Sequence, residues 1–255
     1  MAALLRGTHI GLPLPIDWID ILDSRRRDFL KIALLAGTSL LAGCRSRLSG
    51  EGGLIRPPGA LPESEFRSAC IGCNVCVNFC HSLKYRSLAI AASWRDFGTP
   101  YVKDMRDYPC TLCMECPKHC PTRALRPIAM EEARMGMALI DLGLCLGWNG
   151  DVCLSCSKAC PMGAVIFDFH PGDWGNQPYI NESCKGCGLC VKHCPVGTSA
   201  VKVATWESYG RLKESYRSEV QRVLGMQQEE RYAWVYERNL PKILEAGKVM
   251  ERDFR

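Results

Sequence analysis

Aromatic residues are scarce in this sequence: Phe, Tyr and Trp make up 8% of its 255 residues. A chain of this length can form one or two small domains. With so few large aromatic side chains, however, a hydrophobic core alone is a weak source of stability. We therefore expect another kind of cross-link to hold part of the chain together.

The sequence also lacks the marks of several functional classes. Its net charge is +5, and its basic residues are mixed with acidic ones, so nucleic acid is not an expected partner. There is no glycine-rich nucleotide-binding motif and no nucleophile with a neighbouring base, so no catalytic residue is assigned. The apolar run 32–42 is shorter than the roughly 20 residues of a membrane-spanning helix. None of the five histidines is assigned as a ligand.

Cysteine, by contrast, is abundant, with 17 residues. Sixteen of them form four groups of four: Cys70, Cys73, Cys76 and Cys80; Cys110, Cys113, Cys116 and Cys120; Cys145, Cys153, Cys156 and Cys160; and Cys184, Cys187, Cys190 and Cys194. The first, second and fourth groups have the spacing C-x-x-C-x-x-C-x-x-x-C, which is typical of bacterial ferredoxins. A proline follows every group except the first, which is followed by His81. The spacing predicts four [4Fe–4S] clusters with these sixteen cysteines as iron ligands.

The third group departs from this spacing. Seven residues, LGWNGDV, separate Cys145 from Cys153 where two are expected. We expect a glycine-rich bulge with Trp148 at its tip, which still lets Cys145 reach the iron. Elsewhere, small residues such as Gly72 and Gly186 suit a backbone that turns tightly around a cluster. Zinc sites, disulfides and c-type haem attachment also use closely spaced cysteines, but the repeated ferredoxin spacing favours clusters.

Short β-type runs flank the cysteine groups, as a ferredoxin fold requires. These runs are residues 87–92, 100–102, 124–128, 137–141, 164–169, 178–180 and 200–203. Because the plan occurs twice, we predict an α+β fold with two tandem bacterial 2[4Fe–4S] ferredoxin-like units, loop-rich cluster-binding cores and a helical C-terminal tail. The predicted boundaries are 1–43 for a signal peptide, 44–61 for a linker, 62–130 for unit 1, 131–204 for unit 2 and 205–255 for the tail.

The repeat also favours a pairing of neighbouring groups, in which the last cysteine of one group completes the cluster of the next. The first unit then has one set of Cys70, Cys73, Cys76 and Cys120 and another of Cys80, Cys110, Cys113 and Cys116. The second unit has one set of Cys145, Cys153, Cys156 and Cys194 and another of Cys160, Cys184, Cys187 and Cys190. A nested pairing, of the first group with the fourth and the second with the third, stays open because periodicity cannot exclude long-range contacts.

Two helical segments are expected outside the cysteine groups. A short helix starts near Pro62, after a Gly/Pro-rich spacer. Beyond the fourth group, an amphipathic helix is expected that is interrupted before Pro241. Its apolar residues are Trp206, Tyr209, Leu212, Tyr216, Val220, Val223 and Leu224. This stripe either packs on its own domain or docks on a partner.

An export signal is predicted near the N-terminus. Arg26 and Arg27 begin the stretch RRDFLK, which matches the twin-arginine pattern, and the apolar run 32–42 follows as a signal h-region. Iron–sulfur ligation is coupled to folding and takes place where thiols stay reduced. A cluster protein therefore has to cross the membrane folded, which is what the twin-arginine pathway allows.

The seventeenth cysteine, Cys44, stands apart from the four groups. It ends the stretch LAGC, which has the pattern of a lipoprotein cleavage box, so we predict that Cys44 is lipidated and becomes the first residue of the mature chain. Ordinary cleavage nearby, or an uncleaved leader that serves as a tether, is the alternative.

The twin-arginine leader, the segment IRPPGALPESEF, the four motifs and the stretched CLGWNGDVCLSCSKACP together resemble the NapG/MauM-type periplasmic ferredoxin-like proteins over roughly residues 25–203. The missing proline after Cys80, the lipoprotein box and the long tail depart from that pattern. The resemblance implies an electron-transfer protein, not itself an enzyme, on the periplasmic side of the cytoplasmic membrane. Its partners would be a polytopic membrane quinol-oxidising protein and a c-type cytochrome or periplasmic reductase.

Two other roles stay open at this point. One is the iron–sulfur subunit of a molybdenum oxidoreductase complex, and the other is a non-redox scaffold or assembly factor that uses clusters structurally.

Overall fold

The fold was obtained as a computed structural model, which describes residues 53–170 and 174–247. These residues belong to one compact unit, Gly52–Arg255. The predicted export signal at Arg26 and Arg27 and the predicted lipidation site at Cys44 lie outside the described residues.

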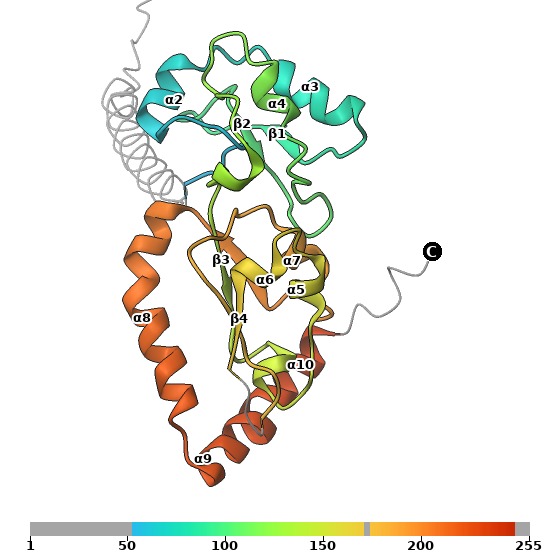
Figure 1. The fold of residues 1–255 in the computed structure, drawn as a ribbon, viewed down its shortest axis with the longest axis vertical. Helices are drawn as coiled ribbons and strands as arrows, with labels where there is room; N and C mark the ends of the chain where they lie inside the picture. The colour runs from blue at the N-terminus through green and yellow to red at the C-terminus, as the bar shows by residue number, and fades with distance from the viewer. Residues whose placement is uncertain (1–52, 171–173, 248–255) are drawn as a thin grey trace, which may run out of the picture. The chain divides into compact units, whose positions relative to one another are not determined.

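The first half of the described chain, up to residue 135, contains one antiparallel pair of short strands (Figure 1). Leu88 of β1 lies opposite Val102 of β2. Helix α2 follows Pro62, where its start was predicted, and buries Phe66. The elements of this half are α2 (Glu63–Ala69), α3 (Val75–Ser82), β1 (Leu88–Ile90), β2 (Pro100–Val102), α4 (Glu115–Lys118) and the 3₁₀ helix η1 (Met130–Glu132).

The second half contains two antiparallel strand pairs, β4 with β5 and β3 with β6. In the longer pair, Met137 lies opposite Ala204 and Ile140 opposite Val201. Before the C-terminal helices, the elements are β3 (Met137–Ile140), the 3₁₀ helix η2 (Leu146–Trp148), α5 (Ser155–Ala159), α6 (Gly163–Ile166), β4 (Phe167–Phe169), β5 (Pro178–Ile180), α7 (Leu189–Lys192) and β6 (Val201–Ala204).

The two halves follow the same plan. The pairs β1–β2 and β4–β5 each join the segment after one cysteine group to the segment before the next. The pair β3–β6 has a much shorter counterpart in the first half, a single antiparallel bridge between Ala60 and Leu125. The strand predicted at 124–128 is therefore reduced to that bridge. The strand predicted at 164–169 begins only at Phe167, because the short helix α6 takes its first residues.

The described part of the segment 44–61, predicted as a linker, packs against the first half. The Val102 N–H donates to the Ile55 carbonyl at 2.8 Å, so this segment runs beside β2. Arg56 is 6% exposed, and its guanidinium bonds to side chains from α2 and from the β1–β2 loop. These residues are thus part of the fold of the first half.

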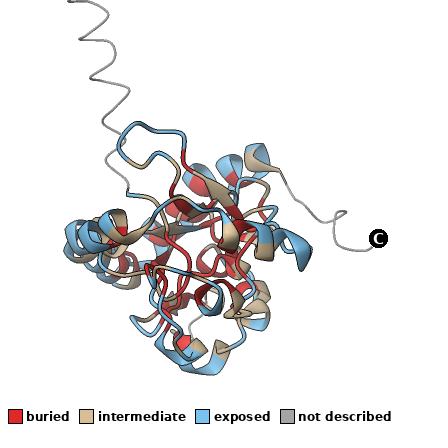
Figure 2. Cartoon of the chain, turned by 90° about the horizontal axis from the view of Figure 1, so that it is seen from above, coloured by how far each residue is buried: buried red, intermediate tan, exposed pale blue. Residues whose placement is uncertain are grey.

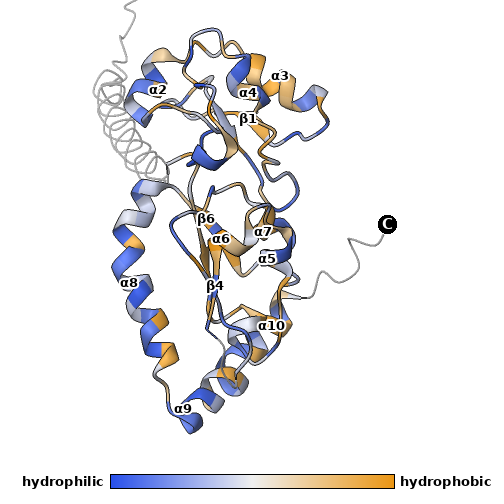
Figure 3. Ribbon diagram, viewed as in Figure 1, coloured by the Kyte–Doolittle hydropathy of each residue, from blue (hydrophilic) through white to orange (hydrophobic). Residues whose placement is uncertain are grey.

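The C-terminal helices cover the second half, as Figure 1 shows. They are α8 (Trp206–Leu224), α9 (Gln228–Tyr232), the π-helix η3 (Ala233–Asn239) and α10 (Leu240–Ala246). Figure 3 shows a largely hydrophilic α8 with scattered apolar residues. Of the predicted apolar stripe, Tyr209, Val220 and Val223 are buried in the core of the second half, whereas Leu212 is 47% exposed. The stripe therefore packs on its own domain.

The predicted interruption before Pro241 is present, but it does not fall at the proline. The helix breaks earlier, between α8 and α9, where the Gly225 N–H caps α8 by donating to the Gln221 carbonyl at 3.0 Å. The second helical run then continues through Pro241, which sits in the first turn of α10. A proline has no N–H to offer the preceding turn, and here that turn is the π-helix η3, whose wider pattern accommodates the missing bond.

Figure 2 shows buried residues on the inner strands and loops and exposed residues on the outer faces of the helices. One core cluster of buried residues lies in each half, and both contain cysteines. Among the described residues, none of the helices is both long and apolar enough to cross a membrane.

Candidate cluster-binding sites

Four cavities of similar size, each about 20 Å³, are lined by four cysteines each. Site A has Cys70, Cys73, Cys76 and Cys120. Site B has Cys80, Cys110, Cys113 and Cys116. Site C has Cys160, Cys184, Cys187 and Cys190. Site D has Cys145, Cys153, Cys156 and Cys194. These sets are the ones that the pairing of neighbouring groups predicts, and the nested pairing is not what the structure shows.

Short helices distribute the cysteines between neighbouring sites. Cys76 and Cys80 lie one turn apart on α3, and the first lines site A while the second lines site B. Cys116 on α4 lines site B, and Cys120 just after that helix lines site A. Helices α5 and α7 make the same exchange between sites C and D. The x-x-x spacing before the last cysteine is thus one helical turn that leads to the other site.

The backbone between the cysteines has a repeated turn. In the first, second and fourth groups, the residues on both sides of the second cysteine have positive φ: Gly72 and Asn74, Leu112 and Met114, and Gly186 and Gly188. At Gly186 a Cβ atom would lie 2.4 Å from the Gly136 nitrogen, so glycine is required there. In the second group, Leu112 and Met114 adopt the same strained conformation without glycine. The sequence carried no sign of that strain.

Backbone N–H groups point at several of the cysteine sulfurs. Leu125 donates to Cys120 Sγ at 3.4 Å, Gly186 to Cys184 Sγ at 3.4 Å, and Ala200 to Cys194 Sγ at 3.2 Å. Such donors stabilise a thiolate, which is the form of cysteine that binds iron. The arrangement fits sulfurs that carry negative charge.

Burial has the opposite effect on most of the thiols. It raises the pKa of Cys76, Cys110 and Cys156 to about 12. At Cys120 burial also raises the pKa, but hydrogen bonds, the largest from Leu125, outweigh it and the net pKa is lowered. Four thiolates converging on a buried cavity repel one another and need a cation between them. The donor set therefore fits an iron–sulfur cluster, whose iron atoms supply that positive charge. Within the described ranges, no three His, Cys, Asp or Glu side chains are grouped to hold a single metal ion.

Comparisons with known proteins agree with this chemistry. A family model for a 4Fe-4S dicluster domain matches residues 151–198, and one for a 4Fe-4S binding domain matches residues 67–86. The methylamine utilization ferredoxin-type protein MauM of Paracoccus denitrificans is 37% identical over 68% of this chain and 80% of its own length. The ferredoxin-type protein NapG of Escherichia coli is 35% identical over 75% of this chain and 91% of its own. The chain belongs to this family of ferredoxin-type proteins.

No solved structure matches the chain. The family and the matched domains make the chain an iron–sulfur protein of the electron-transfer type that binds 4Fe-4S clusters. The resemblance read from the sequence is thereby confirmed.

The stretched third group of this ferredoxin-type protein folds inward, which corrects the expected bulge with Trp148 at its tip. Trp148 is 0% exposed, and its indole N–H donates to the Pro178 carbonyl at 2.8 Å. Inserted residues with a large apolar side chain gain more by filling the core than by standing in solvent. Cys145 still lines site D, as expected.

Two asparagines that sequence reasoning missed fix this insertion. Asn176 accepts from the Cys153 N–H at 3.3 Å and donates to the Cys153 carbonyl at 2.8 Å. Asn149 donates to the Cys145 carbonyl at 2.8 Å and accepts from Asn239 at 2.9 Å. Nothing in the local pattern marks Asn176, which lies 23 residues from its partner in the chain.

The four sites of the ferredoxin-type protein are linked in a row. Burial is the main cause of the raised pKa of Cys116 in site B. The nearby Cys76 thiol of site A raises the pKa of Cys116 further. The Cys110 N–H of site B donates to the Cys187 carbonyl of site C at 2.8 Å. Burial is the main cause of the raised pKa of Cys190 in site C, and the nearby Cys156 thiol of site D also raises it. The order is A, B, C, D, with A and D at the ends.

The histidines take no part in the cysteine cavities that the structure describes. His81 Nε2 is 3.0 Å from the Leu88 carbonyl oxygen, and the His119 ring stacks on Phe79 with 3.5 Å between centroids. His9 lies outside the described residues.

Proposed function

We propose that this ferredoxin-type protein is an electron relay with four [4Fe–4S] clusters, one in each of sites A to D, held by the sixteen cysteines that line them. The observation that carries the proposal is the row of four cavities of similar size, each lined by four cysteines and each linked to the next. A non-redox scaffold needs clusters for stability but has no need of an unbroken row.

The chain supplies the sulfur ligands, the N–H donors and the exclusion of water. When bound, each cluster accepts and releases single electrons at a potential that its surroundings set between about −700 and +450 mV. Hydrogen bonds to the sulfurs, such as those to Cys184 and Cys194, favour the more negative reduced state and so raise the potential. Burial of the sulfurs disfavours the more negative reduced state and so lowers the reduction potential.

The relay works on the outer face of the cytoplasmic membrane. Arg26 and Arg27 direct export of the folded protein by the twin-arginine route, and lipidated Cys44 anchors it to the bilayer. The donor is a polytopic membrane protein that oxidises quinol, and the acceptor is a c-type cytochrome or a periplasmic reductase. Family membership and the motifs in the leader support this location and these partners.

The test combines cluster analysis with quinol reduction. Purified mature protein should contain iron and sulfide for four cubane clusters, and redox titration followed by electron paramagnetic resonance should resolve their potentials. In membranes that contain the partner, adding quinol should reduce the clusters. If quinol cannot reduce the clusters in those membranes, the proposed relay function is wrong. A co-purifying molybdenum subunit would favour an oxidoreductase complex instead.

Export and anchoring have their own test. Replacing Arg26 and Arg27 with lysine should leave the protein in the cytoplasm with its clusters loaded, because the change affects recognition and not ligation. Cys44→Ala should release the exported protein from the membrane without loss of iron, since stable anchoring needs two or more acyl chains. An unmodified Cys44 in the mature chain would contradict lipidation.

A further inference from the structure

The loop between β1 and β2 carries the two most exposed large hydrophobic side chains of the described residues. Trp94 is 77% exposed and Phe97 is 78% exposed, and Arg95 between them is exposed as well. Single apolar residues on a surface need no explanation. Two aromatic residues and an arginine within four positions are different, because Trp and Arg dominate the energetics of protein interfaces.

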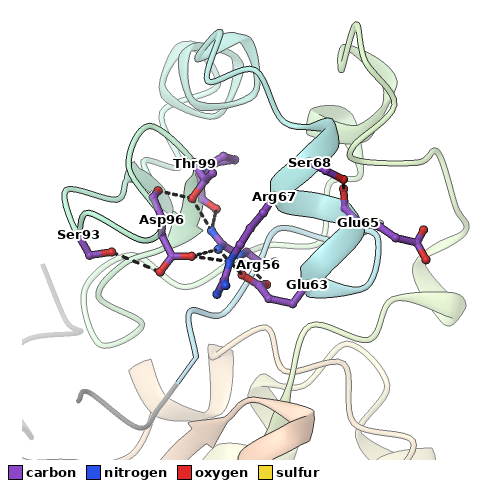
Figure 4. A network of polar contacts seen from close by, with 9 residues as sticks. Arg56, Glu63, Glu65, Arg67, Ser68, Ser93, Asp96 and Thr99 are labelled. Atoms are coloured by element: carbon purple, nitrogen blue, oxygen red, sulfur yellow. Dashed lines mark hydrogen bonds and ion pairs between the residues drawn. The ribbon is translucent and has the colours of Figure 1, made fainter. Parts of the chain in front are cut away.

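A network around a buried arginine holds this loop in place (Figure 4). The Arg56 guanidinium donates to Asp96 Oδ1 at 2.8 Å and to the Thr99 hydroxyl at 2.8 Å, and it also bonds to Glu63 on α2. Arg67 adds a second ion pair to Asp96 at 2.9 Å. Asp96 lies between Trp94 and Phe97 in the chain, so its ion pairs hold the backbone that carries both aromatic residues. A surface that is ordered before binding loses little entropy when a partner docks.

The loop borders site A, one end of the row. Gly72, between Cys70 and Cys73, packs on Gly98 so closely that a Cβ atom at Gly72 would lie 3.2 Å from the Gly98 carbonyl oxygen. Cys73 is exposed, and Ile71, two positions earlier in the chain, is 69% exposed and lines the cavity of site A. An end site with a solvent-exposed ligand is where electrons enter or leave the row.

Near the start of the described residues, the Arg56 side chain bonds to Asp96 of the same loop. Ile55 pairs with Val102 of β2, the strand that follows the loop. Cys44 is eleven positions earlier in the sequence, and a fully extended chain covers at most about 3.6 Å per residue, or roughly 40 Å over that stretch. A chain anchored at Cys44 thus keeps this face within reach of the bilayer surface.

We propose that Trp94, Arg95 and Phe97 form the docking surface for the membrane-embedded electron donor, and that electrons enter the row at site A. This inference rests on the proposed function. The donor would offer an apolar pocket for the aromatic side chains, rimmed by carboxylates for Arg95. Quinol is oxidised to quinone on the donor and releases two electrons and two protons. The electrons pass singly to site A, and the protons are released from the donor.

The first test is the rate of cluster reduction in membranes that contain the donor. The double variant Trp94→Ala, Phe97→Ala should be reduced by quinol about tenfold more slowly or worse, since truncated anchor residues cost at least that much in binding. Reduction by dithionite in solution and the iron content should not change. The matched control is Tyr232→Ala, Leu244→Ala, which removes two side chains 56% and 63% exposed on α9 and α10 and should behave as wild type. Equal quinol rates for both double variants would overturn the proposal.

The second test does not depend on electron flow. A photo-reactive benzoylphenylalanine placed at Phe97 should crosslink in native membranes to a polytopic membrane protein, and the same group placed at Tyr232 should not. Adducts with lipid alone, with a second copy of this chain or with a soluble protein would each contradict the proposed occupant. If quinol fails to reduce wild type while this crosslink forms, the proposed function fails and the docking surface stands.

Discussion

The two halves of the molecule hold cysteines at the same spacing but support them differently. In the first half a buried arginine and its carboxylate partners join the β1–β2 loop to α2, and Cys73 is exposed. In the second half Trp148 fills the core, the C-terminal helices pack over it, and all four cysteines of the fourth group are buried. The comparison teaches that the same cysteine spacing occurs in both halves, while the surroundings of each site decide whether its cysteines are exposed or enclosed.

The largest effect is expected from removing the apolar side chain that supports the second half. Trp148→Ala should lower the free energy of unfolding by about 3–5 kcal/mol, because it leaves a large cavity and an unpaired Pro178 carbonyl. The measurement is denaturant unfolding followed by circular dichroism and by cluster absorption. Trp94→Ala is the matched control, and at 77% exposure it should stay within about 0.5 kcal/mol of wild type. Similar losses for both tryptophans would contradict the buried position of Trp148.

The polar support of the first half should be weaker but still measurable. Arg56→Leu removes the cation shared by Glu63 and Asp96, and it should cost about 2 kcal/mol, less than a fully buried pair because Glu63 is partly exposed. Limited proteolysis should then cut within residues 91–99 while the second half stays intact. Arg67→Ala, at a more exposed position, should cost no more than about 1 kcal/mol. Resistance of the loop in Arg56→Leu would show that other contacts order it.

What the sequence allowed us to predict follows from local spacing. In each cysteine set three members lie close in the chain and the fourth comes from the neighbouring group, so the repeated motif is enough to predict the sets. The short helices and most of the strands depend on residues that are close in the chain. The inward fold of Trp148 depends on Pro178, thirty positions away, and the packing of Arg56 depends on Asp96, forty positions away. Such contacts leave no periodic signal.

The helical tail shows the same limit. Pro241 correctly suggests a disturbed helix, but the neighbouring π-helix absorbs the disturbance, and the real break falls at Gly225. Leu212 is apolar and at helical spacing, yet it is left exposed. Spacing predicts which face of a helix is apolar. The extent of the domain surface under the helix decides how much of that face is buried.

Replacing the last cysteine of a group, which lines the neighbouring site, should sharpen the comparison further. The expected effect is smaller and confined to one cluster. Cys80→Ser should damage only the cluster at site B, and Cys160→Ser only the one at site C, because each residue lines one cavity. Electron paramagnetic resonance of the reduced protein should show one altered signal in each variant and three that match wild type. An altered signal from the fourth group in Cys80→Ser would support the nested pairing and contradict the observed sets.

The smallest expected effect comes from Arg106, one of the residues that join the two halves. Arg106, in the first half, donates to the Val191 and Cys194 carbonyls at 2.7 and 2.9 Å, so its charge lies beside a ligand of site D. A nearby positive charge stabilises an added electron. Arg106→Gln should therefore lower the reduction potential of the cluster in site D by roughly 40 mV, which corresponds to about 1 kcal/mol for a one-electron couple. Lys158→Gln is the control, because that charge is exposed on α5 and water and salt screen it. A titration in which site D keeps its potential while another site shifts would place the Arg106 charge elsewhere in the row.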